Sequence, residues 1–200
     1  MRERFRETTT QAILTAAEDV FAQQGLHAAH MGEIATRAGV AVGTLYNHFK
    51  DREALLAGLL EARRAAMLTR IDSTLRETAR RPFREKLRAL LATLLAHAQA
   101  HQRFFEILMQ SEIGRYQQTF PSACHTQSET MRQMYARIEK LMKQGVRDKE
   151  LRPEIADLAP LLFLAMVRAL AIRAAVLKVD GDFVGETDRL LAFFLDGAGA

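Results

Sequence analysis

Apolar side chains recur with a helical period along most of the chain. Near the N-terminus one helical face is formed by Ile13, Ala17, Val20 and Phe21. Thr8 precedes Gln11 by three residues, which is the spacing of a capping box, and Gly25 follows the apolar face as a helix-ending residue. The pattern therefore predicts a helix from Thr8 to Gly25.

Two short helices are predicted next. The first has apolar positions in the i, i+3, i+4, i+7 pattern, namely Met31, Ile34, Ala35 and Ala38. Gly39 supplies the left-handed residue that ends it, and Val40 is apolar where the turn needs a buried side chain. The second turns Leu45 and Phe49 inward. Together with the first helix, these two have the dimensions of a helix-turn-helix.

The remainder of the chain is also predicted to be helical. Asp51 is the predicted N-cap of a long helix that ends near Arg80 and Pro82. Further helices are expected at about 83–100, at 103–113, in a segment ending at Gly145, at 158–177 and from about Phe183 to the C-terminus. No convincing period-2 run is present. We expect an all-α fold with an N-terminal three-helix domain at 1–52 and a larger helical domain at 53–200.

The second short helix has an unusual exposed side. If Leu45 points inward, the outward arc holds Gly43, Thr44, Tyr46, Asn47 and His48, which include hydrogen-bonding groups but no carboxylate. Asn pairs well with adenine, Thr contacts bases or methyl groups, and Tyr and His reach phosphate oxygens. This face is suited to double-stranded DNA.

Residues 10–56 resemble the DNA-binding domain of the TetR family of bacterial transcriptional regulators. The resemblance rests on the run Ala35–Val40 and on Gly43–Leu56, and is supported upstream by Ile13-Leu14, Ala16-Ala17 and Phe21–Gly25. It implies a homodimeric regulator, released from a pseudo-palindromic DNA operator by a small-molecule effector. The DNA-contacting set expected from the residues and the resemblance is Arg37, Val42, Gly43, Thr44, Tyr46, Asn47, His48 and Arg52.

Some positions depart from the family pattern. Ala29 and His30 stand where many members have a Thr or Ser cap, and Ala41 and Val42 stand where Ser and Lys often open the recognition helix. We expect these departures to affect the operator sequence and the affinity rather than the fold. They also motivate an alternative, a helical effector-binding protein with weak or lost DNA binding.

The C-terminal half offers candidates for the effector site and for the dimer interface. Polar and apolar side chains expected to line the effector site are His97, His101, Phe104, Phe105, Met109, Met131, Met134, Tyr135, Phe163 and Met166. For each apolar residue, a place in the core is the simpler interpretation. The last two helices are the most apolar and are expected to pair with their copies in a homodimer.

Composition adds little to this picture. The chain has 200 residues and a net charge of +4, but residues 1–52 hold equal numbers of basic and acidic side chains. The single cysteine, Cys124, and the lack of an apolar leader favour a cytoplasmic protein. The apolar run 158–177 contains Arg168 and Arg173, so an interior or subunit-interface helix is favoured over a membrane span.

Three other features have competing interpretations. Arg2, Arg4 and Arg6 are interpreted as a disordered tail rather than a minor-groove arm. His97 and His101 have a metal-ligand spacing, but nothing places Cys124 or His125 beside them, so no metal is expected. No cofactor or catalytic motif is recognised, and we expect no enzyme activity.

Overall fold

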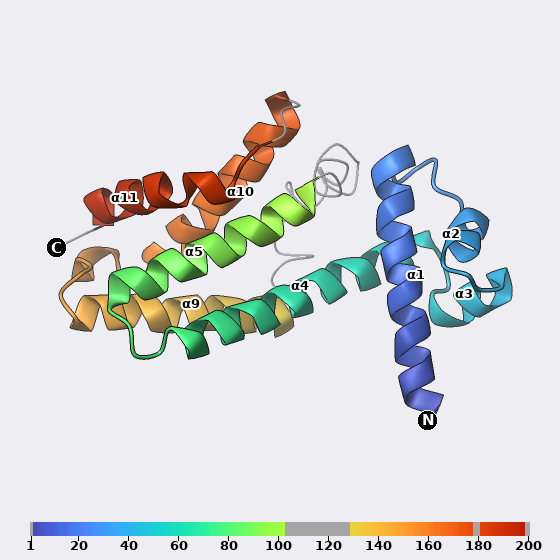
Figure 1. Ribbon diagram of the computed structural model, residues 1–200, viewed down its shortest axis with the longest axis horizontal. Coiled ribbons are helices and arrows are strands. Elements are labelled where there is room, and N and C mark those ends of the chain that lie inside the picture. The colour runs from blue at the N-terminus through green and yellow to red at the C-terminus, as the bar shows by residue number, and fades with distance from the viewer. Residues whose placement is uncertain (1, 103–128, 178–180, 199–200) are drawn as a thin grey trace.

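The computed structural model describes residues 2–102, 129–177 and 181–198, and every regular element in these ranges is helical (Figure 1). Helices α1 (Arg2–Gln24), α2 (Met31–Arg37) and α3 (Val42–His48) lie together at one end. Helix α4 (Arg52–Glu77) leads from them to α5 (Phe83–Ala100), α9 (Glu129–Arg147), α10 (Ala159–Leu177) and α11 (Thr187–Ala198). The all-α prediction is confirmed.

Helix α1 begins earlier than the sequence pattern predicts. Thr8 does not cap a helix start; its hydroxyl donates to the carbonyl oxygen of Arg4 from within the helix, and Thr9 makes the same contact with Phe5. The proposed start at Thr8 was wrong because helical residues already precede it and satisfy these hydroxyls locally. The interpretation of Arg2, Arg4 and Arg6 as part of a disordered tail was also wrong, because α1 already begins at Arg2. Arg4 and Arg6 are exposed on this helix.

The N-terminal helices share one hydrophobic core. The four apolar positions predicted for α1 are all buried, as are Ile34 and Leu45 from α2 and α3. Gly39 ends the α2 segment with a φ of 68°, a conformation that costs glycine little. The predicted N-cap is confirmed, since Asp51 Oδ1 accepts a hydrogen bond of 2.7 Å from the Ala54 amide. The core continues into the first turns of α4 through Leu55 to Leu60.

A second core joins α4, α5, α9, α10 and α11. Leu87, Leu90, Leu91 and Leu95 of α5 are central to it and almost completely buried. Gly145 permits α9 to approach α5, because a Cβ at this position would lie 2.5 Å from Phe83 Cζ. The last helix begins at Thr187 rather than near Phe183; Phe183 is buried in the preceding turn, ahead of the 3-10 helix Val184–Glu186.

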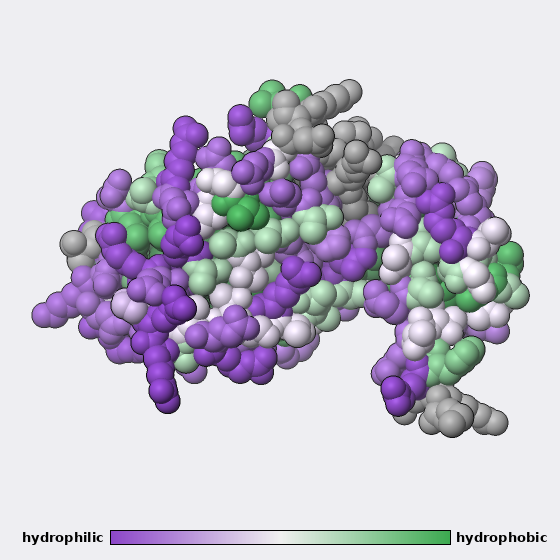
Figure 2. Space-filling model, viewed as in Figure 1, coloured by the Kyte–Doolittle hydropathy of each residue, from purple (hydrophilic) through white to green (hydrophobic). Residues whose placement is uncertain are grey.

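Helices α10 and α11 leave much apolar surface uncovered in the single chain. Large exposed side chains on these helices are Leu161, Leu162, Ile172, Leu177 and Phe193, the last at 73% exposure. Figure 2 shows apolar patches interrupting the hydrophilic surface around these helices. Helix α10 is therefore not interior within one chain, and Arg168 and Arg173 are exposed on it. Among the described helices, none is sufficiently long and apolar to cross a membrane.

Candidate DNA interface and domain junction

The core of the N-terminal domain determines which side of α3 is exposed. Leu45 is fully buried, so the residues on the opposite side project outward: Val42 is 45% exposed, Tyr46 is 49% exposed, and Gly43 and Asn47 are exposed. Thr44 and His48 are half-buried at the edges of this face. No carboxylate belongs to α3. The exposed side thus offers a phenol, an amide and a methyl-bearing surface to a groove.

His48 is held by a long-range contact that the sequence pattern did not indicate. Its Nδ1 lies 2.9 Å from the hydroxyl oxygen of Thr10, and the same hydroxyl lies 2.9 Å from the Arg6 carbonyl oxygen. When the single hydroxyl proton is donated to the carbonyl, the hydroxyl accepts from Nδ1–H of the imidazole. This contact orients the His48 ring through α1.

The predicted phosphate-binding arginines already have protein partners. Arg52 Nη1 donates to the His27 carbonyl oxygen at 2.7 Å, and Arg37 Nη1 donates to Gln23 Oε1 at 2.9 Å. Both guanidinium groups retain other N–H groups. Lys50, directly after α3, is 83% exposed along its side chain, lies 3.7 Å from Asp51 Oδ2, and was absent from the predicted set. Its position beside the recognition helix is the feature that identifies it.

The family departures are visible in the helix caps. His30 and Ala41 are the N-caps of α2 and α3, and neither makes a side-chain hydrogen bond to its helix. The amide donors at these two helix starts receive no hydroxyl acceptor from their caps.

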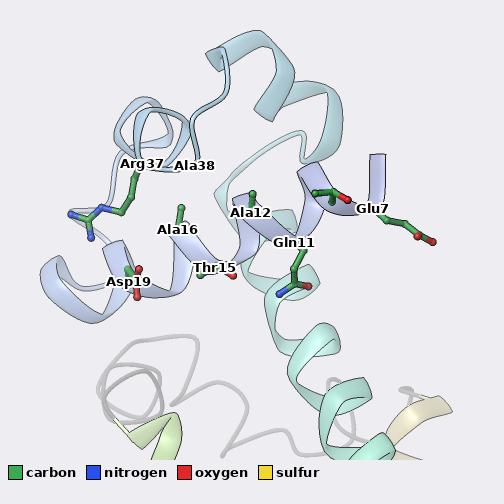
Figure 3. Close-up of a pocket in the computed structure, with 9 residues that line it drawn as sticks. Glu7, Gln11, Ala12, Thr15, Ala16, Asp19, Arg37 and Ala38 are labelled. Carbon is green, nitrogen blue, oxygen red and sulfur yellow. The ribbon is translucent and has the colours of Figure 1, made fainter. Parts of the chain in front are cut away.

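A groove on the N-terminal domain differs in charge from the exposed side of α3. It lies between α1 and α2, has a volume of about 650 Å³, and is lined by Glu7, Gln11, Thr15, Asp19 and Arg37 among others (Figure 3). Its carboxylates make it a poor surface for phosphate. The carboxylate-free side of α3 is the better candidate for DNA.

The residues predicted to line an effector site are only partly brought together. Met134 and Phe163 are buried in the C-terminal core, and Met131, Tyr135 and Met166 are half-buried. Phe163 packs edge-on against Phe194, with ring centroids 5.5 Å apart. Phe104, Phe105 and Met109 lie outside the described residues. A role in the core accounts for Met134 and Phe163 without a ligand.

His97 and His101 instead lie where the two cores meet. His97 lies on α5 and His101 directly follows it; their rings are 4.6 Å apart, and His101 Nδ1 is 2.6 Å from Glu18 Oε1 on α1. The other oxygen of Glu18 accepts from Nη2 of Arg63 on α4. Glu18, Arg63 and His101 therefore form a three-helix junction. Sequence periodicity could not place Glu18 beside His101, because 83 residues separate them.

Burial leaves the two imidazoles uncharged. It lowers the pKa of His97 to about 4, aided by His101, Arg70 and Arg63, and burial with Arg63 and Arg70 lowers the pKa of His101 to about 4. Burial also lowers the pKa of the Arg63 guanidinium. Two buried polar atoms at this junction, Arg63 Nε and His97 Nδ1, have no hydrogen-bond partner among the described residues.

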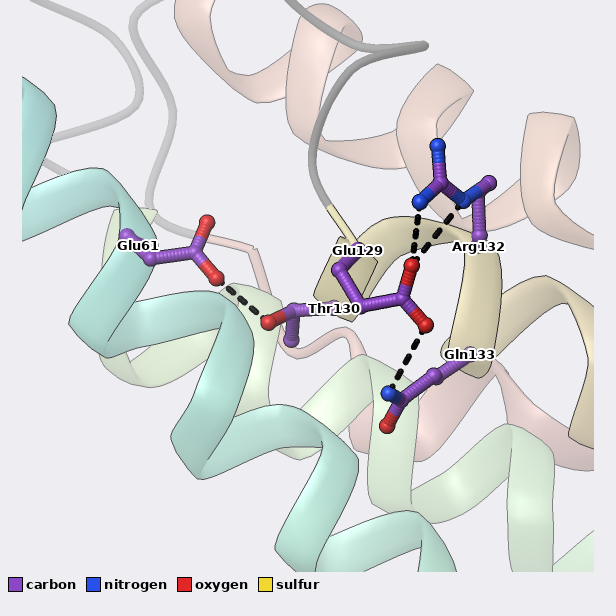
Figure 4. A network of polar contacts seen from close by, with 5 residues as sticks. All are labelled: Glu61, Glu129, Thr130, Arg132 and Gln133. Carbon is purple, nitrogen blue, oxygen red and sulfur yellow. Dashed lines mark hydrogen bonds and ion pairs between the residues drawn. The ribbon is translucent and has the colours of Figure 1, made fainter.

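Polar contacts also connect α4 to the start of α9. Thr130 donates to Glu61, while Glu129 accepts from Arg132 and Gln133 within the first turn of α9 (Figure 4). Hydrogen bonds from Gln133 and Arg132 lower the pKa of the Glu129 carboxyl. The part of the chain that the structure describes contains no group of three or more His, Cys, Asp or Glu side chains arranged for a metal. Cys124 and His125 lie outside it.

Comparisons with known proteins agree with this geometry. Residues 13–59 match the family model for bacterial regulatory proteins of the tetR family. The fatty acid metabolism regulator protein of Bacillus subtilis is 36% identical over 67 residues, which is 34% of each chain. The alignment thus spans about a third of that relative's length.

Solved structures resemble the chain over nearly its whole length. The fatty acid degradation regulator FadR from Bacillus halodurans superposes with a TM-score of 0.77 at 21% identity, covering 93% of this chain and 94% of the other. The regulator FadR from Bacillus subtilis, in complex with stearoyl-CoA, has a TM-score of 0.76 at 20% identity, covering 94% and 98%. At these identities the likeness shows the fold. Residues 13–59 therefore carry a helix-turn-helix that matches the TetR family of bacterial regulatory proteins, on a fold that the whole chain shares with these solved structures.

Proposed function

We propose that this chain is a ligand-responsive repressor that binds a pseudo-palindromic DNA operator as a homodimer. The observation that carries the proposal is the exposed, carboxylate-free side of α3, held rigidly on a three-helix core. Tyr46 and His48 lie at positions suited to phosphate, and Asn47 and Thr44 at positions suited to base edges. Helix α4 belongs to both cores and thus transmits movement between them.

The exposed apolar side chains of α10 and α11 support a second copy of the chain as partner. Several large exposed apolar side chains on two neighbouring helices are typical of an interaction site. Two copies related by a two-fold axis would present two α3 helices to one duplex. Each α3 then enters a major groove when the two are about 34 Å apart. Homodimerisation and operator symmetry thus form one proposal.

We further propose an effector with an acyl chain, bound in the helical C-terminal domain. This is supported by the stearoyl-CoA complex of a regulator that shares the fold and by the apolar residues of α9 and α10. An effector that moves α4 changes the separation of the two α3 helices and releases the operator. By linkage, the effector binds the DNA-free dimer more tightly than the DNA-bound dimer.

The test is selection of bound sequences from a random duplex pool with the full chain. We expect enrichment of a palindrome. Asn47→Ala should change the enriched sequence, whereas Tyr46→Phe should weaken binding at every sequence without changing it. A chain that enriches no sequence, yet binds stearoyl-CoA, would instead be the helical effector-binding protein without DNA binding.

A further inference from the structure

Helices α4 and α5 form an antiparallel pair whose facing side chains are polar along one edge. Thr74 and Thr93 hydroxyl oxygens lie 2.8 Å apart across this pair. One turn along each helix brings Arg70 opposite His97, and beyond them Arg63 and His101 meet at Glu18. A polar strip therefore connects the outside of the helical domain with the domain junction.

The outer part of this strip is an open groove of about 490 Å³. It is lined by Thr69, Arg70, Ser73, Thr74, Ala92, Thr93, Ala96 and Val184, which contribute one guanidinium group, four hydroxyl groups and a larger apolar surface. No carboxylate is among these residues. The Thr69 and Thr93 hydroxyls already donate to the Ala65 and Ala89 carbonyl oxygens, and the Thr74 hydroxyl donates to Thr93. The guanidinium of Arg70 and the hydroxyl of Ser73 are therefore the groove donors left for an oxyanion.

The inner part of the strip has unused donor capacity. Nε and Nη2 form the edge of a guanidinium that binds a carboxylate or phosphate with two parallel hydrogen bonds. On Arg63, Glu18 takes only Nη2, because its other oxygen is directed to His101, and Nε is buried without a partner. Nδ1 of His97, which is 5% exposed, is the second orphan. Leaving such atoms unpaired is unfavourable, so a ligand that pairs them gains affinity.

We propose that the strip formed by Arg63, Arg70 and His97 binds an oxyanion, phosphate or carboxylate, which competes with Glu18 for the guanidinium of Arg63. Among the described residues, Arg63 and Arg70 face one carboxylate here, that of Glu18, and burial lowers the pKa of both imidazoles to about 4. Binding of the anion frees Glu18 from Arg63 and thereby loosens α1 from α4. The consequence for operator release rests on the proposed function, whereas anion binding itself does not.

Anion binding is tested on the full chain with three probes at neutral pH and constant ionic strength. Sodium pyrophosphate and sodium octanoate distinguish a phosphate from a carboxylate, and octanol is the uncharged control. The readouts are calorimetric affinity and the imidazole ¹⁵N resonances. We expect saturable binding of at least one anion, with a change at His97, and no such change with octanol. If only water satisfies the two orphan atoms, neither anion saturates and the proposal fails.

Variants expected to weaken anion binding and variants expected to strengthen it together separate competition with Glu18 from structural damage. Arg70→Gln should weaken anion binding about tenfold, the loss expected for one charged hydrogen bond. Arg80→Gln, which removes the same charge from an exposed position outside the groove, should leave it unchanged. Glu18→Gln should strengthen anion binding because the competitor is removed, and Asp19→Asn, on the exposed neighbour, should not. Weaker binding in Glu18→Gln would overturn the competition.

Two further measurements keep the outcomes distinct. If Glu18→Gln does not fold, Glu18→Gln with Arg63→Gln removes both partners of the ion pair and should bind the anion less tightly than the unmodified chain. Operator affinity without any anion tests the proposed function alone. A chain that binds its operator but shows equal anion affinity in Arg70→Gln and Arg80→Gln refutes the anion site and leaves the regulator function intact.

Discussion

The Thr10 hydroxyl and His48 Nδ1 lie 2.9 Å apart, which joins α1 to the recognition helix across 38 residues of sequence. We predict that Thr10→Val weakens operator binding by about 1 kcal/mol, roughly fivefold, because the imidazole loses its orientation. Fluorescence anisotropy with labelled operator measures the effect. Thr9→Val is the matched control, since Thr9 donates only to the Phe5 carbonyl within α1. Equal losses in both variants would show that helix stability, not His48, is responsible.

Acidification should destabilise the protein through His97 and His101. Their pKa values are about 4 in the folded chain and about 6.5 when unfolded, so between these values the unfolded chain binds more protons. The free energy of unfolding is therefore highest above pH of about 6.5 and falls as the pH is lowered toward about 4. The charged groups facing the pair are Glu18, Arg63 and Arg70.

Urea unfolding at a series of pH values checks this prediction. His97→Leu should reduce the slope in that pH range by up to about 1.4 kcal/mol per pH unit, the contribution of one titrating group. His27→Gln, at an exposed loop position, is the control and should keep the slope of the unmodified chain. An unchanged slope in His97→Leu would mean that this imidazole titrates alike in both states.

Gly145→Ala should destabilise the C-terminal core. The added Cβ would lie 2.5 Å from Phe83 Cζ and 3.0 Å from Leu151 Cδ1, and both neighbours are buried. We expect a loss of about 1 to 3 kcal/mol, measured by urea unfolding. Gly32→Ala is the contrasting variant, because nothing lies within 4 Å of its Cβ and alanine is the better helix former. Equal stability of the two variants would contradict the close packing of α9 on α5.

Phe193→Glu should convert the proposed homodimer to a monomer. Phe193 is 73% exposed on α11, so a charge there disturbs a partner subunit but not the chain's own core. Sedimentation velocity gives the oligomeric state, and circular dichroism verifies that the helices persist. Phe5→Glu places the same charge at a 76% exposed phenylalanine on α1 and should remain dimeric. A dimeric Phe193→Glu would place the interface elsewhere.

Local sequence determined the helices and the recognition face. The spacing of Ile34, Leu45 and their neighbours predicts which sides are buried, since a helix repeats every 3.6 residues and needs no distant information. The turn at Gly39 and the cap at Asp51 likewise depend on a few adjacent atoms. The same local reasoning misplaced the start of α1, because a capping-box spacing also occurs within a helix.

Only the tertiary structure decided which side chains meet across helices. The sequence grouped His97 and His101 with an effector pocket, whereas the fold places them against Glu18 at the domain junction. It also joined Arg52 to the His27 carbonyl and His48 to Thr10. Such contacts depend on the packing angle of whole helices, which is determined by the sum of many buried apolar contacts. No single residue spacing encodes that angle, so the junction emerged only from the folded chain.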